Sequence, residues 1–443
     1  MKLQTLILIA AAILLTPGLG AQEATQLGAQ EAPRLGAQEA QRSEAALQML
    51  RENPNRAGAN IHVYEFIPEK DTPAPKGYKP VYLAYYARHG ARNNGDTRSY
   101  EYVIKYLEKA DSAGILNSEG LYLLEKTREV LAEFDGMPGH LTRRGEYEHR
   151  ELARRLYKRN KAIFRKGSKN IRVESTTVPR TLVSMACCVS ELSSIQKDLN
   201  FNINTGEKYS ILGNNCSKAQ KAATQVLLDS LRKHTSSDNE SIYRTLFTDP
   251  AVAKTIITNP GRFQRHIFNT AAISESVGVA DDLWRLLPED VIYRQWDLHN
   301  RSLYIRQCNS VEYGDQRMKK TEPLVKEIVS HADEALSGGK MAADLYFGHD
   351  FPAMAVAAYF ALEGPGDRLT FDEIPFGYCN PRWVCFAMNI QWIFYRGRKG
   401  DVLCKIVFNG EEMHIRGLKA VSEYYYRWED IKGILPCIAN PAA

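Results

Sequence analysis

Residues 81–87 (VYLAYYA) form a nearly continuous apolar run, bounded by Pro80 and by a polar turn. A strand with one face in water alternates apolar and polar side chains, whereas a strand buried on both faces reads as an unbroken apolar run. The run therefore predicts a central strand in a sheet that helices cover on both sides. This arrangement is typical of α/β proteins.

Short strands and amphipathic helices alternate along much of the remaining chain. Further strands are predicted at residues 171–173, 344–347, 389–395 and 402–408. Helices are predicted at residues 142–164, 179–192 and 351–362. The last two strands are separated by glycines and form a hairpin. We expect an α/β fold with a mixed, largely parallel sheet flanked by helices.

The middle of the chain has a different pattern. Residues 186–335 carry little strand pattern but many polar helix formers and loop signals. We interpret this stretch as an inserted α-rich domain. The α/β domain that it interrupts then has two parts, residues 59–185 and 336–443.

The N-terminus is typical of a secretory signal peptide. Lys2 precedes ten apolar residues (6–15), and a helix break with small residues follows, so residues 1–20 are predicted to be removed. Ten apolar residues are too few for a transmembrane helix, which needs about 20. An octapeptide then occurs three times (LGAQEATQ, LGAQEAPR, LGAQEAQR), and we interpret residues 21–58 as a linker. We expect a secreted or periplasmic protein without an integral membrane segment.

Composition narrows the classes of partner. The net charge of +5 is spread along the chain with no run of five or six like charges, so nucleic-acid binding is not expected. None of the eight cysteines forms a Cys-x-x-Cys pair or lies at metal-ligand spacing from a histidine, so neither a metal nor another cofactor is expected. Disulfide pairing and oligomeric state are left open.

Three polar clusters follow predicted strands. They are residues 88–92 (RHGAR), Arg180, and residues 348–350 (GHD). In open α/β sheets, ligands bind at the carboxyl ends of the strands, where helix N-termini offer free N–H groups to anions. Three arginines, two histidines and one carboxylate in such a crevice predict a phosphate site.

Each residue type has a chemical reason to be there. The planar guanidinium matches phosphoryl oxygens at any pH, so Arg88, Arg92 and Arg180 are predicted to bind phosphate. A neutral imidazole attacks phosphorus when its other nitrogen holds a proton on a carbonyl oxygen, which is the role predicted for His89. Gly90 is expected to let the backbone turn behind this ring, where a larger residue would crowd the phosphate.

The third cluster supplies the remaining groups. His349 is predicted to donate a hydrogen bond to the same phosphoryl group. Asp350 is predicted to protonate the leaving alkoxide and then to accept a proton from water. Because this acid must start protonated, we expect an acidic pH optimum.

Other polar and aromatic residues fit structural roles better. His149 falls on one helical face with Leu152 and Leu156, which is typical of a core histidine. Residues 331–334 (HADE) offer an acid–base pair, but they lie inside a predicted helix (321–336) that no strand precedes. The aromatic residues 424–426 and Trp428 are predicted to lie in the core or in a lid.

Together with other segments, these motifs resemble the histidine acid phosphatase family, which includes acid phosphatases, phytases and multiple inositol-polyphosphate phosphatases. Residues 141–145 (LTRRG) with His149 are similar to the family's helix start, and residues 174–181 (ESTTVPRT) to the segment of its third phosphate arginine. Residues 387–391 (AMNIQ) and 394–396 (FYR) resemble a late strand of bacterial inositol-polyphosphate phosphatases. The resemblance implies a histidine-phosphatase-like fold, a phosphohistidine mechanism without a metal, and a variable α domain that sets specificity.

Two positions depart from the family pattern. Asn94 stands where the family usually has proline, and residues 349–351 (HDF) replace the His-Ala-Glu common in inositol-polyphosphate phosphatases. The His-Asp form is more usual in acid phosphatases and phytases.

The leading interpretation is a secreted phosphomonoester hydrolase acting through a phosphohistidine intermediate on inositol polyphosphates such as phytate. The positive net charge suits such an anionic phosphorylated small molecule. The alternatives are a broad-specificity acid phosphatase, a phosphoglycerate-mutase-like phosphotransferase, and a non-catalytic anion-binding protein.

Overall fold

The computed structural model describes residues 44–213, 216–234, 238–280 and 282–439. The chain divides into two units, Met1–Glu52 and Asn53–Ala443. In the first unit, residues 44–52 are helical, while the predicted signal peptide and the octapeptide repeats lie outside the described residues. The second unit contains the elements discussed below, beginning with the 3-10 helix η1 (Pro54–Ile61).

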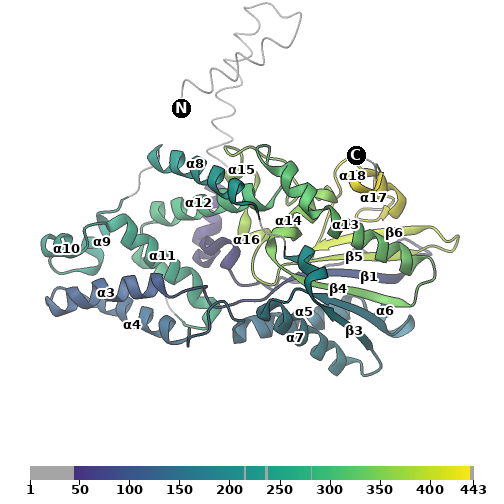
Figure 1. Cartoon of the computed structure of the whole chain (residues 1–443), viewed down its shortest axis with the longest axis horizontal. Helices are drawn as coiled ribbons and strands as arrows, with labels where there is room; N and C mark the ends of the chain where they lie inside the picture. Colours follow the sequence, from purple (N-terminus) through teal and green to yellow (C-terminus); the bar gives the residue numbers. More distant parts are fainter. Residues whose placement is uncertain (1–43, 214–215, 235–237, 281, 440–443) are drawn as a thin grey trace, which may run out of the picture. The chain divides into compact units, whose positions relative to one another are not determined.

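A mixed sheet is the centre of the second unit (Figure 1). Its path has the order β3-β2-β4-β1-β5-β6-β7, and β8 pairs with β6. The strands are β1 (Lys79–Arg88), β2 (Asn170–Ser175), β3 (Asn200–Thr205), β4 (Met341–Gly348), β5 (Asn389–Arg396), β6 (Val402–Phe408), β7 (Glu411–Glu412) and β8 (Tyr426–Arg427). The pairs among β3, β2, β4 and β1 are parallel, and those from β1 onward to β5 and β6 are antiparallel. The predicted strands and their hairpin are confirmed.

Strand β3 is an element that the sequence pattern did not predict. Its sequence NFNINT places asparagine at alternate positions, and asparagine is depleted in strands. The strand pairs along its whole length with β2, at the edge of the sheet. Its pairing with β2 and its position at the edge of the sheet explain its extended conformation. Neither can be recognised from the local sequence.

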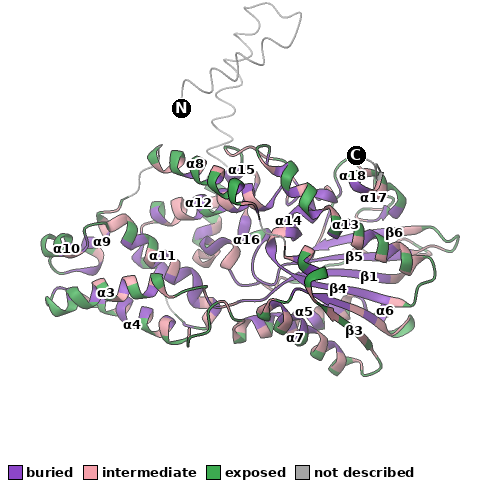
Figure 2. Ribbon diagram, viewed as in Figure 1, coloured by how far each residue is buried: buried purple, intermediate pink, exposed green. Residues whose placement is uncertain are grey.

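Helices cover both faces of the sheet (Figure 1). On one face, α5 (Arg143–Arg159) and α7 (Pro179–Ile195) pack on side chains such as Leu83 and Val173. On the other, α13 (Gly314–Leu336) and α14 (Asp350–Tyr359) pack on Tyr82 and Tyr86. Because β1 has helices on both sides, its residues from Tyr82 to Arg88 are all buried, as Figure 2 shows. The continuous apolar pattern of this strand therefore reflects its central place.

The α-rich region draws on two stretches of chain. After β3 come η2 (Glu207–Leu212), α8 (Lys218–His234), α9 (Ser241–Leu246), α10 (Pro250–Ile256), α11 (Pro260–Val277), η3 (Leu283–Leu286) and α12 (Glu289–Gln307). Two helices that follow β1, α3 (Arg98–Ser112) and α4 (Ser118–Ala132), join them. Tyr102 of α3 stacks on His266 of α11 with ring centroids 4.3 Å apart. The proposed insert boundary at residue 186 falls within α7.

The remaining helices are short: α6 (Lys161–Lys166), α15 (Ile374–Gly377), α16 (Asn380–Trp383), α17 (Trp428–Ile434) and α18 (Pro436–Ala439). All eight cysteines have free thiols in the structure. A search of the described residues finds no helix that combines the length and the apolar character needed to cross a bilayer.

Candidate active site

A cavity of about 620 Å³ lies at the carboxyl ends of β1, β2 and β4. Parallel pairing sets Arg88 of β1 beside Gly348 of β4, so the residues that follow these strands, His89 and His349, emerge next to each other. Their ring centroids are 5.3 Å apart. The structure brings all six residues predicted for the site into the lining of this cavity: Arg88, His89, Arg92, Arg180, His349 and Asp350.

His89 is 2% exposed, and its orientation is fixed by the backbone. Its Nδ1 lies 2.9 Å from the carbonyl oxygen of Gly90. Since that oxygen can only accept, Nδ1 carries the ring proton and Nε2 has a free lone pair. Burial, and then the charges of Arg88 and its neighbours, hold the pKa of His89 well below its usual value. Burial and these charges therefore favour the neutral form of the ring.

Gly90 is required by helix packing. A Cβ at this position would lie 2.6 Å from the carbonyl oxygen of Gly145 and 2.7 Å from its Cα. A Cβ on Gly145 would in turn meet the backbone of Ala91. Contact between the His89 loop and the first turn of α5 is thus a reason for Gly90 that the sequence did not predict, beside the expected crowding of the phosphate. Thr142, the N-cap of this helix, donates its backbone N–H to Ala91 O at 2.9 Å.

The three arginines come from different elements. Arg88 ends β1, Arg92 lies in the loop after it, and Arg180 is in the first turn of α7 behind Pro179. Burial and then the charge of Arg88 lower the pKa of Arg92 to about 10, and the same two causes lower the pKa of Arg180. These shifts mean that the guanidinium groups repel one another, so an anion among them would be stabilised.

Asp350 and His349 lie at the N-terminus of α14, where His349 is the N-cap and Asp350 the first helical residue. Asp350 is 5% exposed, and its Oδ2 is 3.3 Å from Arg88 Nη2. Burial disfavours the charged carboxylate, but Arg88, a hydrogen bond from Asn60 and the other positive groups outweigh it, so the pKa of Asp350 is lowered. Burial and then Arg180 lower the pKa of His349 to about 4.

The sequence pattern missed three residues that position these groups. Asn60 Nδ2 donates to Asp350 Oδ2 at 2.9 Å. Glu148, fully buried in α5, accepts from the backbone N–H of Ala91 at 2.7 Å. Ser184 Oγ accepts from Gly90 N at 3.1 Å. A signal existed for Glu148, because a glutamate on the apolar face of an amphipathic helix indicates a buried carboxylate with a special task. Asn60 and Ser184 belong to no recognisable pattern.

The residues assigned structural roles lie elsewhere. His149 is fully buried, 5.8 Å from the ring of Phe347. His331 lies inside α13 and does not line the cavity. Tyr425, Tyr426 and Trp428 are buried in the core.

The cavity is lined by the buried imidazole of His89, three guanidinium groups and the carboxyl group of Asp350. The guanidinium groups can hold three oxygens of a tetrahedral anion, and the free Nε2 of His89 can approach its central atom. Among the described residues, the one group of side chains with metal-ligand spacing lies outside this cavity.

Comparison with known proteins identifies the fold. No protein-family model matches the chain, and no curated protein sequence matches it. The apo structure of a multiple inositol polyphosphate phosphatase from Bifidobacterium longum is similar, with a TM-score of 0.67 at 15% identity over 87% of this chain and 98% of that chain. Its complex with inositol hexasulfate gives a TM-score of 0.65 at the same identity and coverage.

The phytase from D. castellii is similar with a TM-score of 0.68 at 13% identity, over 87% of this chain and 85% of that chain. The chain therefore has the fold of these proteins, the histidine acid phosphatase fold. The α/β fold expected from the sequence and its histidine-phosphatase-like character are confirmed.

Proposed function

We propose that the protein is an exported phosphomonoester hydrolase that acts through a phosphohistidine intermediate on inositol polyphosphates. The observation that carries this proposal is the setting of His89. Its Nδ1 is held on a backbone carbonyl oxygen, and it shares the cavity with Arg88, Arg92 and Arg180. One cavity therefore contains an imidazole that can attack phosphorus and three guanidinium groups that can bind the phosphoryl oxygens.

In the first step, Nε2 of His89 attacks the phosphorus of a bound monoester. The P–N bond forms as the P–O bond to the alcohol breaks, and the proton of Asp350 passes to the departing alkoxide oxygen. The three arginines stabilise the charge on the other phosphoryl oxygens. The products of this step are the free alcohol, a phosphohistidine and an Asp350 carboxylate.

In the second step, Asp350 accepts a proton from water as the water oxygen attacks phosphorus. The P–N bond breaks, its electron pair returns to Nε2, and inorganic phosphate leaves. His89 is neutral and Asp350 is protonated again, so the cycle closes. Substrate monoester and water have been converted to alcohol and phosphate, with no other reactant.

The lowered pKa of Asp350 is consistent with this cycle. Arg88 is the main charge that lowers the pKa of this carboxyl group. A bound phosphate offsets the positive charge of the arginines and so raises the pKa of Asp350 toward the protonated form that the first step needs. Substrate binding and acid activation are therefore coupled.

The substrate class is supported by the cavity and by the similar structures. A cavity of about 620 Å³ is much larger than one phosphate group and accommodates a ring-sized ester. The similar proteins include an inositol polyphosphate phosphatase and a phytase. The His-Asp sequence of α14 favours a second candidate, a broad-specificity acid phosphatase.

Phosphate release should be compared for myo-inositol hexakisphosphate and a small aryl phosphate between pH 3 and 8, with His89→Ala as control. We expect a higher kcat/KM for the inositol ester and a loss of at least about 10⁴-fold in His89→Ala. Preference for the aryl ester would favour the broad-specificity candidate. Undiminished release by His89→Ala would refute the mechanism.

Two other classes are separated by the same assay. A mutase-like phosphotransferase would move phosphate between positions of its product, whereas a hydrolase releases it to solution. A non-catalytic binding protein would bind phosphate without turnover. Export is tested independently, by cell fractionation and by sequencing the N-terminus of the mature chain.

A further inference from the structure

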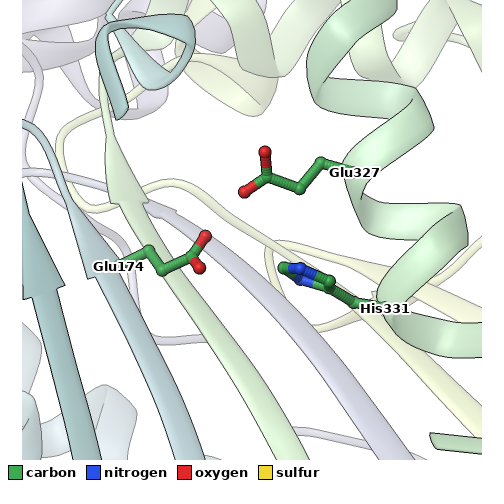
Figure 3. Close-up of side chains that lie close together, drawn as sticks. All are labelled: Glu174, Glu327 and His331. Carbon is green, nitrogen blue, oxygen red and sulfur yellow. The ribbon is translucent and has the colours of Figure 1, made fainter. Parts of the chain in front are cut away.

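A second polar cluster lies between the sheet and α13, outside the cavity described above. It consists of Glu174 from β2 and of Glu327 and His331 from α13. One ligand atom from each of the three side chains lies within 4.8 Å of the other two. Figure 3 shows both carboxylates and the imidazole directed toward a common space.

The two carboxylates lack a balancing charge. Glu174 is 3% exposed, and its Oε2 is buried without a hydrogen-bond partner, as is Oε1 of Glu327. Within the described part of the chain, no Lys, Arg or His nitrogen lies within 4.0 Å of either carboxylate. The nearby guanidinium of Arg172 is paired with Glu334 at 2.9 Å and with Asp344 at 3.5 Å.

Two adjacent carboxylates in such a place cannot both stay ionised without a cation. A proton shared by the pair, or a metal ion held by it, would supply the missing positive charge. The imidazole of His331 favours the metal ion, because it adds a nitrogen ligand on the same side of the carboxylate pair.

His331 is oriented as a ligand would be. Its Nδ1 lies 2.7 Å from the hydroxyl of Tyr346, a fully buried residue of β4. The Asp344 carboxylate lies 3.9 Å from the same nitrogen. These outer contacts engage Nδ1 and leave Nε2 for a ligand, which is how metal-binding histidines are usually held.

We propose that Glu174, Glu327 and His331 bind a divalent transition-metal ion of the zinc or manganese type. Two carboxylates and one imidazole are the ligand set that such ions accept, whereas calcium prefers oxygen ligands only. The ligand atoms would move closer together to reach bonding distances of about 2.0–2.2 Å. Water would complete the coordination on the solvent side of the half-buried Glu327 and His331.

The ion would tie β2 to α13. Glu174 lies two residues before Thr176, which lines the cavity, so the bond would fix the end of β2 at the site's edge. The sequence expectation of no metal rested on the spacing of Cys and His. It could not detect ligands that come from a strand and a helix about 150 residues apart in the chain.

The test uses the full chain, freed of metal by a chelator and then titrated with zinc or manganese chloride. We expect one equivalent of bound metal by elemental analysis after dialysis. Tm should rise by about 3 °C at a free metal concentration of 100 Kd. Cobalt(II) in the same place should give visible absorption bands characteristic of its coordination.

Three variants locate the ion. Glu327→Gln and His331→Gln should each reduce metal affinity at least tenfold and abolish the rise in Tm. Glu334→Gln is the matched control, because Glu334 lies on the same helix but pairs with Arg172. It should keep both the stoichiometry and the shift.

Glu327→Gln removes one of two repelling carboxylates, so the metal-free variant is expected to fold. Absence of tight metal binding by the wild-type chain would refute the proposal and assign a shared proton to the pair. Equal loss of binding in Glu334→Gln and Glu327→Gln would also refute it, because the ion would then lie elsewhere. None of these readouts depends on phosphatase activity.

Discussion

Asp350 combines a structural environment that favours its charge with a proposed chemical role that needs its proton. Arg88 Nη2 and Asn60 Nδ2 both approach its Oδ2, at 3.3 Å and 2.9 Å. A carboxyl group at the first position of α14 is further stabilised as an anion by the helix dipole. The proton transfer that we propose for Asp350 therefore depends on a bound anion that offsets these effects.

The proposed role of Asp350 as proton donor can be tested by comparing substrates with different leaving groups. Asp350→Asn cannot protonate a departing oxygen, so the rate for an inositol phosphate, whose alkoxide leaves poorly, should fall by about 10²–10⁴-fold. An aryl phosphate with an acidic phenol should lose far less, because its leaving group needs little protonation. Measuring kcat for both esters with each enzyme checks this. Equal losses for the two esters would argue that Asp350 has only a binding role.

Asn60 affects the pKa of the same carboxyl group. Its hydrogen bond stabilises the ionised carboxylate, and hydrogen bonds to charged groups contribute about 1.5–3 kcal/mol. Asn60→Ala should therefore raise the pKa of Asp350, and the alkaline limb of the kcat–pH profile should move up by about one to two units. Asn55→Ala is the control, since Asn55 lies in the same 3-10 helix but accepts a hydrogen bond from Trp284. A uniform fall in kcat at every pH would mean that Asn60 only supports the fold.

At the scale of elements, strand pairing explains why distant motifs share one site. The parallel register that sets Arg88 beside Gly348 also brings the end of β2 next to β4, with Ser175 opposite Phe347. Strands with continuous apolar sequence and the polar residues after them could be predicted, because both signals are local. The cavity lined by the candidate residues lies at these predicted strand ends.

Other contacts could not be predicted, because they join elements that no local pattern links. Asn60 reaches Asp350 across 290 residues of chain, and Ser184 reaches Gly90 across 94. The packing role of Gly90 could not be predicted for the same reason. Only the packed position of α5 shows that Gly145 stands behind it.

The contact between α5 and the His89 loop should be sensitive to one methyl group. In Gly145→Ala, the new Cβ would lie 2.8 Å from Ala91 N and 2.7 Å from a methyl carbon of Leu141. Overpacking of this kind costs about 1–3 kcal/mol, and here it also displaces the loop that carries His89. We expect a lower Tm together with a lower kcat.

Gly433→Ala is the matched control for this substitution. Gly433 lies in α17, and a Cβ there meets no atom within 4 Å. Alanine favours a helix by up to about 1 kcal/mol over glycine, so Tm should stay or rise and kcat should be unchanged. A Gly145→Ala enzyme as active and stable as this control would contradict the packing argument.

At the scale of the whole molecule, the acidic conditions that favour the protonated Asp350 of the proposed mechanism also lower the stability of the fold. Three of the buried histidines, His89, His149 and His349, have lowered pKa values, and burial is the first cause for each. Histidine has a pKa of about 6.5 in the unfolded chain. Below this pH the unfolded chain therefore binds protons that these buried histidines do not bind in the folded chain. Stability is then lost as pH falls, although an anion in the cavity would reduce the loss for His89 and His349.

His149 gives the clearest measure, because it is fully buried and lies outside the cavity. Its pKa is lowered to about 4 by burial. Between pH 6.5 and pH 4 the unfolded state binds the extra proton, so the free energy of unfolding decreases as pH falls through this window. The full shift corresponds to a loss on the order of 3 kcal/mol from this one residue.

Replacing His149 with leucine should remove that dependence. Urea unfolding at pH 6.5, 5.5 and 4.5 should show a steeper fall in stability for the wild type than for His149→Leu, since leucine binds no proton in either state. The variant's stability at pH 6.5 reports only the change in packing, so the slope carries the test. His140→Gln, at an exposed position, should keep the wild-type slope. Parallel slopes for His149→Leu and the wild type would show that the buried imidazole accepts a proton as readily as the unfolded chain does.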